Sequence, residues 1–491
     1  MLATSVGMRN GSGHATAIPH RCSADNSIPC PTFGLDGIRT PPILFRGNPM
    51  SSTPTRPGMA VPSTRLSRLW HLGRATGDLA AGIGVKGLME LARTRRSAEP
   101  SRIRLSPEHT RRFTDRLARM RGAVMKMGQL MSMDGSDIFT PEAAEIMSAL
   151  RERAEPMPMS QLAGVLEREY GPGWNEKFKR FEFTPVASAS IGQVHRAETR
   201  DGRRLALKIQ FPGVRESIDS DIDNLAFLAR TLGMAPAGVD LTPYLEGARR
   251  QLHQEADYGA EADSLEAYGA GVGADPDFLV PRVHRDLSTS RVLAMDFAEG
   301  VPVDRLADSG YSCEERDRAA TALTRLSMRE LFEFGLVQSD PNFGNYLYDA
   351  DSGRIVLLDF GAALPVSSEL IERYRRLARA AFADDRAAMR AASIDLGYVG
   401  ANDPSEQVNA LIDLLRMSSE PLRSPGRYDF GVSDLFERVY ARGREMFYSG
   451  AFSTVPAPET MFLHRKFMGA FMLCRRLRAR VDLGGMLRPY L

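Results

Sequence analysis

Two short motifs in the second half of the chain carry side chains suited to phosphoryl transfer. They are Gln-Ser-Asp-Pro-Asn-Phe-Gly-Asn at 338–345 and Leu-Leu-Asp-Phe-Gly at 357–361. This chemistry needs a divalent ion held by hard oxygen ligands and an acceptor held in line with the phosphorus atom. Asp340 and Asn345 have the spacing of a kinase catalytic loop, and Asp359 has the place of the metal-binding aspartate in an Asp-Phe-Gly motif. We therefore expect Asp340 to position an acceptor or water, and Asn345 and Asp359 to bind Mg²⁺.

A lysine upstream of both motifs completes the pattern. Lys208 ends the apolar run Leu205-Ala206-Leu207, where a kinase carries the lysine that neutralises the α and β phosphates. A lysine in this position needs a carboxylate from a neighbouring helix. Glu255, Asp257 and Glu261 supply three candidates on one long helix. Asp257 and Glu261 are four residues apart and share a face of that helix, whereas Glu255 and Asp257 are two apart and point differently. Each motif alone has an ordinary structural explanation, but their order along the chain favours catalysis.

The usual glycine-rich phosphate loop is missing before Lys208. In its place stands Val-Ala-Ser-Ala-Ser-Ile-Gly-Gln at 186–193. Small side chains and backbone N–H groups can approach phosphate oxygens there, with less backbone freedom than glycine allows. The nucleotide-binding candidates are therefore Lys208 together with Ala187, Ser188, Ala189 and Ser190. Downstream, the stretch 291–300 is predicted to be an edge strand and hinge, with Asp296 and Ala298 placed to read adenine through their backbone.

The elements that must position these residues change in character along the chain. Helical patterns begin near Ser63, at Ser106-Pro107, at Thr140-Pro141 and at Ser160, the last ending at Gly171. From about residue 181 strands are expected, with a hairpin over 191–198 and 204–210 that turns at Asp201-Gly202. A helix from about 218, one long helix over 242–268, and strands near 278–283 and 291–297 follow. Beyond Asp304 the chain reads as mainly helical, apart from a hairpin around 346–358.

This order predicts an α+β fold of the bilobal, protein-kinase-like kind, with a helical N-terminal extension and a mainly helical C-lobe. We divide the chain into a disordered tail or misassigned start (1–60), a helical extension (61–180), an N-lobe with a helical insert (181–300) and a helical C-lobe (301–491). The first 60 residues are rich in Gly, Ser, Thr, Pro and Arg, which also suits a targeting segment.

Composition narrows the class of protein. The 63 basic and 61 acidic side chains leave a formal net charge of +2, so no global positive field favours nucleic acid. Four cysteines without Cys-x-x-Cys spacing indicate neither a disulfide framework nor a zinc site. Because no run of about 18 apolar residues occurs, no transmembrane helix is expected. The predicted location is cytoplasmic, with peripheral contact to the inner membrane through a basic amphipathic helix near Leu66 as one interpretation and simple helix packing as the other.

The motifs together resemble the UbiB/AarF family of atypical kinase-like proteins. Lys126, Gly128 and Gln129 lie in a Lys-x-Gly-Gln signature. The stretch 187–190 resembles the alanine-rich loop of the family, and 255–257 matches its Glu-x-Asp motif. The catalytic-loop and Asp-Phe-Gly elements follow in the family's order, and the resemblance covers roughly 63–364. Gln338 and Ser339 replace the His-Arg pair of ordinary kinases, as is usual in this family.

The resemblance implies a helical extension lying over the site, with Lys126 and Gln129 pointing to where a protein substrate would otherwise dock. It implies that Glu261 pairs with Lys208, while Glu255 and Asp257 engage the Lys126 region. It further implies ATP or ADP with Mg²⁺ as cofactors and an ATPase or small-molecule or lipid kinase that supports ubiquinone biosynthesis. A membrane surface, a quinone-precursor lipid and other ubiquinone-biosynthesis proteins are the implied partners.

Two other functions fit parts of the pattern. One is a conventional protein kinase, which the missing Ala-Pro-Glu segment after Gly361 disfavours. The other is a lipid-binding scaffold that uses the nucleotide only as a conformational ligand.

Overall fold

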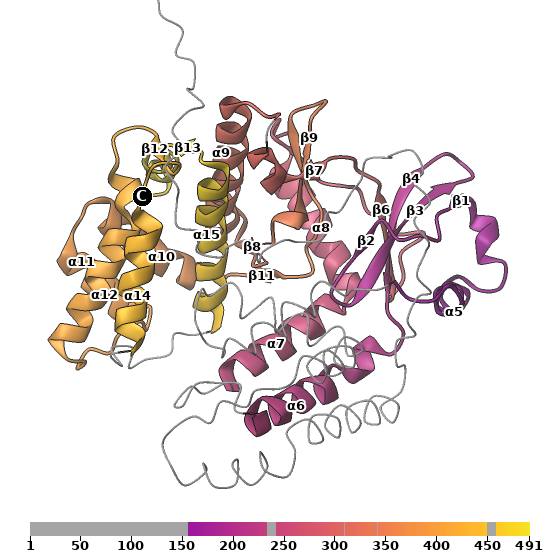
Figure 1. Ribbon diagram of the computed structural model, residues 1–491, viewed down its shortest axis with the longest axis horizontal. Helices are drawn as coiled ribbons and strands as arrows, with labels where there is room; N and C mark the ends of the chain where they lie inside the picture. Colours follow the sequence, from indigo (N-terminus) through magenta and orange to yellow (C-terminus); the bar gives the residue numbers. More distant parts are fainter. Residues whose placement is uncertain (1–155, 233–241, 309, 341, 449–457) are drawn as a thin grey trace, which may run out of the picture. The chain divides into compact units, whose positions relative to one another are not determined.

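The computed structural model describes residues 156–232, 242–308, 310–340, 342–448 and 458–491, all within one compact unit (Figure 1). The helices expected near residues 63, 106 and 140 lie outside this part of the chain, and so does the signature with Lys126, Gly128 and Gln129. The described part is an α+β structure in which antiparallel strands precede a helical half, as the sequence predicts. Within it no helix is long and apolar enough to cross a bilayer.

The first sheet is antiparallel and contains the predicted hairpin. Its order is β1-β3-β4-β6, with β2 beside β3. The strands are β1 (Phe178–Phe181), β2 (Ala187–Ser188), β3 (Gly192–Thr199), β4 (Arg204–Gln210) and β6 (Val292–Asp296). Gly202 makes the β3–β4 turn with a φ of 88°, a conformation that side chains other than glycine rarely adopt. Within this sheet β6 is the last strand, as predicted, although its outer side is partly covered by residues 282–284 through a bridge at Val283 and two backbone hydrogen bonds.

The predicted single helix over 242–268 is wrong, because the chain breaks in its middle. The structure has α7 (Thr242–Glu255) and α8 (Tyr258–Val272), joined by residues that leave helical geometry. At the break, Asp257 has φ −101° and ψ 86°, and its carboxylate accepts hydrogen bonds from the N–H groups of Gly259 and Ala260. An aspartate at this position caps the N-terminus of a helix and satisfies N–H groups that have no partner within it. Asp257 and Glu261 therefore do not share the face of one continuous helix.

Other helices of this half agree with the sequence more closely. The structure has α5 (Met159–Tyr170), which ends at Gly171 as predicted. The helix expected from about residue 218 begins one turn earlier, as α6 (Val214–Leu232).

A second sheet contains four short strands that lie between residues 278 and 357. Its order is β5-β10-β9-β7, built from β5 (Phe278–Leu279), β10 (Arg354–Leu357), β9 (Tyr346–Asp349) and β7 (Val301–Pro302). The β9–β10 pair is the hairpin expected around 346–358. The strand expected over 278–283 is divided, since β5 runs parallel to β10 in this sheet and Val283 alone bridges to β6 in the first. A separate pair joins β8 (Leu336–Gln338) to β11 (Ala363–Pro365).

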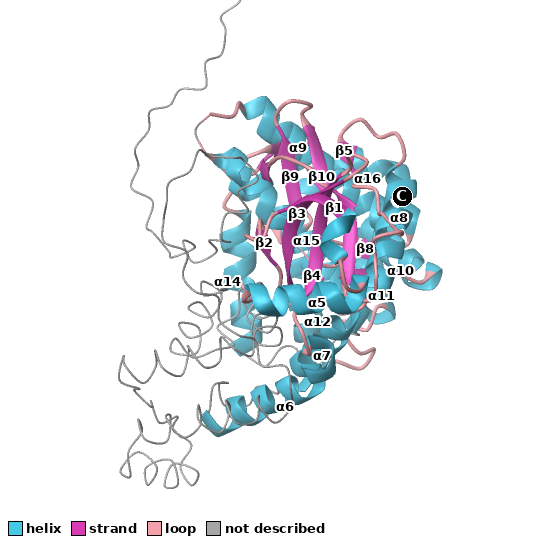
Figure 2. Ribbon diagram, turned by 90° about the vertical axis from the view of Figure 1, so that its right-hand side faces the viewer, coloured by secondary structure: helices cyan, strands magenta, loops and turns pink. Residues whose placement is uncertain are grey.

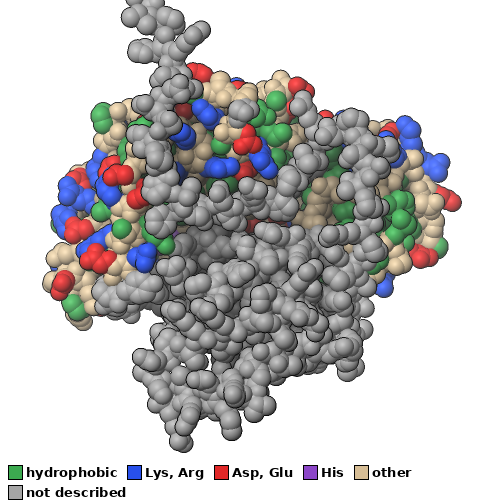
Figure 3. Space-filling model, in the orientation of Figure 1, with side chains coloured by type: hydrophobic (Ala, Val, Ile, Leu, Met, Phe, Trp, Pro, Cys, Tyr) green, Lys and Arg blue, Asp and Glu red, His purple; other side chains and the backbone are tan. Residues whose placement is uncertain are grey.

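The rest of the described chain is mainly helical, as expected beyond Asp304, apart from the short antiparallel pair β12 (Tyr428–Asp429) and β13 (Arg480–Val481). After α9 (Cys313–Arg329) comes a π-helical turn over Glu330–Phe334. The remaining helices are α10 (Ser368–Phe382), α11 (Arg386–Asp395), α12 (Ser405–Ser418), α13 (Glu420–Arg423), α14 (Leu435–Tyr448), α15 (Pro458–Leu477) and α16 (Leu483–Leu487). One large apolar core runs through the sheets, α8, α9 and α15, and a smaller one lies among α10, α11 and α12. Figure 2 shows strands of both sheets flanked by helices, and on the face drawn in Figure 3 basic and acidic side chains are interspersed.

Candidate active site

Lys208 lies at the centre of a buried charge cluster that joins three distant parts of the chain. On β4, paired between Val194 of β3 and Leu293 of β6, its side chain is only 7 % exposed. Its Nζ donates to both carboxylate oxygens of Glu261 on α8, at 2.7 and 2.9 Å. The same Nζ lies 3.5 Å from Oδ2 of Asp359. The pairing of Lys208 with Glu261 is therefore present, and the Asp-Phe-Gly aspartate meets them.

The cluster holds more negative than positive charge. Burial lowers the pKa of Lys208, but Asp359 and Glu261 outweigh that effect and raise it well above its usual range, so the ammonium stays protonated. Burial raises the pKa of Glu261 to about 7; Lys208 opposes this rise, and Asp359 and Glu255 add to it. A methyl group placed on Gly361 would lie 3.4 Å from carboxylate oxygens of both Asp359 and Glu261 and 3.5 Å from Glu255 Cγ. Several carboxylates thus share one ammonium, which is an environment suited to a further cation.

The catalytic-loop candidates Asp340 and Asn345 contact each other. Asp340 and Asn345 are both buried, and the Asn345 amide donates to Oδ2 of Asp340 at 3.4 Å. The N–H of Leu358 donates to the carbonyl of Asn345 at 3.0 Å, which joins this loop to the strand that leads into Asp359. Asp359 Oδ1 accepts from the N–H of Gly361 at 2.9 Å. The carboxamide of Gln338 contacts the backbone of both loops, a role that the sequence did not reveal.

The loop that replaces the glycine-rich motif contacts the Glu-x-Asp motif. Ala187 and Ser188 form β2 against β3, and the N–H of Ala189 donates to the carbonyl of Gly192 at 2.9 Å. The hydroxyl of Ser190 donates to Oε2 of Glu255 at 2.6 Å. Glu255 thus has a partner that the sequence did not predict. The expected contact of Glu255 and Asp257 with the Lys126 region concerns residues outside the described ones, and Asp257 caps α8.

Tyr258, the first residue of α8, is a site residue that is not among the predicted ones. Lys208 Nζ lies 5.4 Å from the centre of its ring. Its hydroxyl is buried and has no hydrogen-bond partner among the described residues. A Cβ on Gly192 would lie 2.9 Å from this hydroxyl and 2.5 Å from the carbonyl oxygen of Ile209, so only glycine fits there. An unsatisfied buried hydroxyl beside the ammonium suits a site that receives a polar ligand.

The hinge candidates lie at the end of β6, where part of the backbone is already paired. The N–H of Asp296 donates to the carbonyl of Arg282 at 3.0 Å. The Asp296 carboxylate accepts from the N–H of Arg282 at 3.2 Å and lies 2.7 Å from His284 Nε2. The side chain of Asp296 is therefore engaged with the 282–284 segment. Ala298 follows two residues later in an irregular stretch before Gly300.

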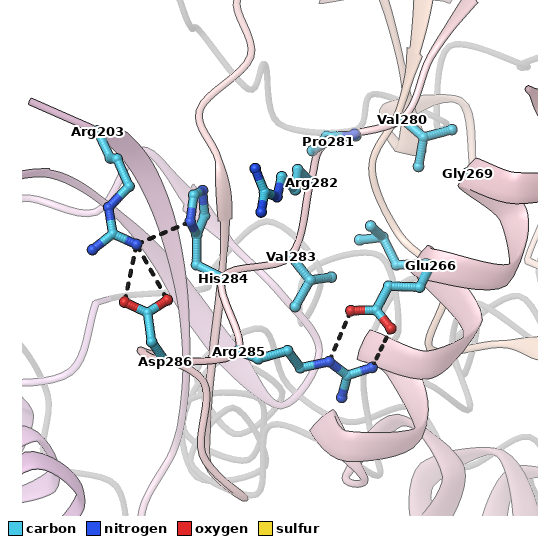
Figure 4. A pocket seen from close by; sticks show the side chains of 11 residues that line it. Arg203, Glu266, Gly269, Val280, Pro281, Arg282, Val283, His284, Arg285 and Asp286 are labelled. Carbon is cyan, nitrogen blue, oxygen red and sulfur yellow. Dashed lines mark hydrogen bonds and ion pairs between the residues drawn. The ribbon is translucent and has the colours of Figure 1, made fainter. Parts of the chain in front are cut away.

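A cavity of about 630 Å³ lies against α8 but contains none of the predicted site residues (Figure 4). It is bounded by Arg203, by α8 at Leu265, Glu266 and Gly269, and by 280–286. Two of its arginines are paired across it, Arg203 with Asp286 at 3.0 Å and Arg285 with Glu266 at 2.8 Å. These charges are paired within the lining of the cavity, so the residues around Lys208 remain the candidate active site.

The residues present fit a nucleotide with Mg²⁺. Within the described ranges no group of three or more His, Cys, Asp or Glu is arranged to hold a metal ion alone. Mg²⁺ is commonly held by one or two protein ligands, with substrate phosphates and water supplying the rest. Asp359 and Asn345 offer such a partial ligand set, and Lys208 offers the charge for phosphate. The donor set therefore suits a metal that arrives with its nucleotide.

Comparisons with known proteins agree with this chemistry. A family model described as an ABC1 atypical kinase-like domain matches residues 149–393. The chain is 36 % identical over 426 residues to the atypical kinase COQ8, mitochondrial, of Saccharomyces cerevisiae, covering 86 % of this chain and 84 % of that protein. It is 36 % identical over 429 residues to the atypical kinase COQ8B, mitochondrial, of Rattus norvegicus, covering 86 % and 79 %. A solved structure of the Rv3197–erythromycin complex from Mycobacterium tuberculosis matches with a TM-score of 0.54 at 25 % identity, over 82 % of this chain and 96 % of that one.

Proposed function

The chain belongs to the ABC1, or UbiB/AarF, family of atypical kinase-like proteins, and from that premise we propose that it is an ATP- and Mg²⁺-dependent ATPase or small-molecule kinase that supports ubiquinone biosynthesis. The observation that carries the enzymatic part is the meeting of Lys208 with Glu261 and Asp359 at 2.7 and 3.5 Å. Apolar packing does not explain why two buried charged groups, Lys208 of β4 and Glu261 of α8, lie beside the partly exposed Asp359 of the Asp-Phe-Gly turn. The assignment to ubiquinone biosynthesis is supported by membership of the family.

Each residue has a part in the proposed reaction. The bound nucleotide and Mg²⁺ supply the phosphoryl group and the charge that stabilises its transfer. Lys208, oriented by Glu261, holds the α and β phosphates, while Asp359 and Asn345 hold the metal. Asp340 positions the acceptor or water. The nucleotide is further bounded by the loop of Ala187, Ser188, Ala189 and Ser190 and by the hinge at Asp296 and Ala298. The family resemblance implies that the Lys126, Gly128 and Gln129 signature faces the region where a protein substrate would otherwise dock, and that Glu255 and Asp257 engage it.

The segment after Asp359 supports a small-molecule reaction over phosphorylation of proteins. Gly361 is followed almost directly by β11 at Ala363, which pairs with β8, and α10 begins at Ser368. A conventional protein kinase uses a longer segment here to bind its peptide. Quinone-precursor lipid at a membrane surface is therefore the partner we propose.

Replacing Asp359 tests the enzymatic proposal. Asp359→Asn keeps the shape of the side chain but removes the charge that binds Mg²⁺, so thermal stabilisation by ATP with Mg²⁺ is expected to disappear together with ATP turnover. Asp351→Asn makes the same chemical change at an exposed position on the β9–β10 turn and should leave both unchanged. Equal stabilisation of wild type and Asp359→Asn by ATP with Mg²⁺ would contradict the assignment.

The pathway is tested separately in cells. Quinone levels are measured in a strain lacking the gene and carrying the wild type, Asp340→Asn or Asp351→Asn. We expect only Asp340→Asn to fail to restore ubiquinone. Normal ubiquinone in the deletion strain itself would exclude the pathway, while full rescue by Asp340→Asn would exclude the need for catalysis.

A further inference from the structure

Gln338 connects the two loops that carry the reacting groups. Its side chain is 2 % exposed. Its carboxamide oxygen accepts from the N–H of Asp340 at 3.0 Å, and its Nε2 donates to the backbone carbonyl of Asp359. Both contacts are to backbone, so they fix where each aspartate leaves the main chain without occupying its carboxylate. Gln338 therefore sets the distance between the group that positions the acceptor and the group that binds the metal.

An amide suits this double contact because it has an acceptor and a donor on one neutral group. An ionised glutamate of the same shape can only accept, and it would bring a further negative charge beside two aspartates. A protonated glutamate has one acceptor and one donor, as the amide has. The connection made by Gln338 is thus insensitive to pH, whereas the same connection made by glutamate would not be.

A buried ion pair lies on the π-helical turn that packs against β8, the strand that carries Gln338. Lys466 of α15 reaches the carboxylate of Glu330, with Nζ to oxygen distances of 2.7 and 2.8 Å, and the two side chains are 5 % and 1 % exposed. Burial raises the pKa of Glu330, while Lys466 and the backbone N–H of Gln338 act against that rise. Burial lowers the pKa of Lys466, but Glu330 and Tyr346 outweigh it and raise the pKa. We assign the pair as ammonium and carboxylate.

Lys466 also touches the far end of the catalytic loop. Its Nζ donates to the hydroxyl of Tyr346 at 3.3 Å, and Tyr346 directly follows Asn345. The ammonium thus contacts the residue that follows Asn345 directly, and its partner Glu330 lies on the π-helical turn that packs against β8, the strand of Gln338. Glu330 opens the π-helical turn after α9, and turns of this rare kind often occur at functional sites.

The ammonium comes from outside the matched family domain. That domain ends at residue 393, whereas α15 covers Pro458–Leu477. In Figure 1, α15 lies beside α9 and next to β8 and β11, in agreement with its packing against α9 and β8. A buried ion pair adds little net stability, because both charges lose their hydration. Its position beside the catalytic loop therefore points to a role in geometry.

We propose that Gln338 is a positioning residue that couples the Asp340 and Asp359 loops, and that the Glu330–Lys466 pair supplied by α15 is its anchor. The inference rests on the proposed function for its kinetic part. Its structural part, the coupling of the two loops, holds without nucleotide.

Gln338→Glu is the decisive variant, studied in the full chain. Its ATPase kcat relative to wild type should rise as pH falls from about 9 to 6, by on the order of tenfold or more, because protonation of the buried carboxyl restores the donor. KM for ATP should change little, since the carboxamide of Gln338 is engaged by the backbone of Asp340 and Asp359. Gln407→Glu, the same change on α12, should show a flat ratio. A flat ratio for Gln338→Glu, or a loss confined to KM, would overturn the proposal.

Gln338→Met gives a second test that needs no activity. It removes both hydrogen bonds at similar volume, so hydrogen exchange in the apo chain should quicken in peptides covering 338–345 and 357–363, and not in the β3–β4 hairpin. Unchanged exchange in those two segments would refute the coupling even if the protein had no ATPase activity. Absence of nucleotide binding and turnover in the wild type would instead reject the proposed function, so the two failures are distinct.

The anchor is tested by Lys466→Met alone and combined with Glu330→Gln. The single change leaves a buried carboxylate without its cation and should quicken exchange at 338–345. The double change removes both charges and should recover thermal stability but not kcat, because Tyr346 and Gln338 remain without their support. Recovery of kcat to the wild-type value in the double variant would show that the pair has no part in positioning.

Discussion

Removing Lys208 should destabilise the protein by an amount that depends on pH. Lys208→Met leaves Glu261 buried at 0 % side-chain exposure, without the ammonium 2.7 Å away. Breaking a buried ion pair by removing one partner commonly costs about 3–5 kcal/mol. Here Glu261 can escape part of that cost by taking up a proton, because its pKa is already about 7.

The direction of the pH dependence follows from proton binding. The pKa of Glu261 lies above the 4.5 of an unperturbed glutamate, so the folded wild type binds more protons than the unfolded chain between pH 4.5 and about 7, and stability falls as pH rises through that window. Lys208 lowers the pKa of Glu261, so in Lys208→Met this pKa is higher and the fall in stability continues above pH 7. Each further pH unit lowers the free energy of unfolding by about 1.4 kcal/mol. Between pH 7 and 8.5 the variant should lose about 2 kcal/mol more than the wild type.

Thermal unfolding followed by tryptophan fluorescence measures this difference. Trp174 packs against Phe178 and Phe181 beside the first sheet and reports on that half. The gap in Tm between wild type and Lys208→Met should widen by a few °C from pH 7 to 8.5. Adding Glu261→Gln should abolish the widening, because the titrating group is gone. Lys179→Met, which removes an exposed partner of Glu198, should show a small gap at every pH. Parallel Tm curves for wild type and Lys208→Met would refute the reasoning.

Two further predictions concern the surroundings of the site. Burial lowers the pKa of His195 to about 4, so the stability that the neutral imidazole contributes is present above pH 6.5 and is lost as pH falls toward 4. In His195→Gln the free energy of unfolding, measured with urea, should therefore fall by up to about 3 kcal/mol less than in the wild type between pH 6.5 and 4. An equal fall in both proteins would contradict this. Gly192→Ala should lower the free energy of unfolding by about 1–3 kcal/mol, because the added methyl group meets the carbonyl of Ile209 and the hydroxyl of Tyr258. Gly164→Ala on α5, with nothing within 4 Å, should raise the free energy of unfolding slightly. Equal effects of the two changes would show that the close contact at Gly192 is relieved without cost.

The correct and incorrect predictions from sequence differ in the kind of interaction involved. The β3–β4 hairpin and α5 were predicted because apolar spacing and turn glycines are local signals. The break at Asp257 was missed because an acidic residue inside a helical pattern is equally typical of a solvated helix face and of an N-cap. Which of the two it is depends on the direction of α8, which brings Glu261 to Lys208. The strand expected over 278–283 was divided because its residues pair with two different sheets, which no local pattern records.

The sequence by itself determined which chemical groups the protein has and their order: Lys208, then Glu255 and Glu261, then Asp340, Asn345 and Asp359. Such residues are recognisable because phosphate and metal chemistry tolerates few substitutes for an ammonium or a hard oxygen ligand. Tertiary structure alone decided which groups touch. Glu330 and Lys466 lie 136 positions apart and meet as a buried ion pair, and Ser190 donates to Glu255, which lies 65 positions away. Those contacts depend on how helices and strands pack. The packing energy is the sum of many weak contacts among apolar residues, so no single residue in the sequence reveals which elements meet.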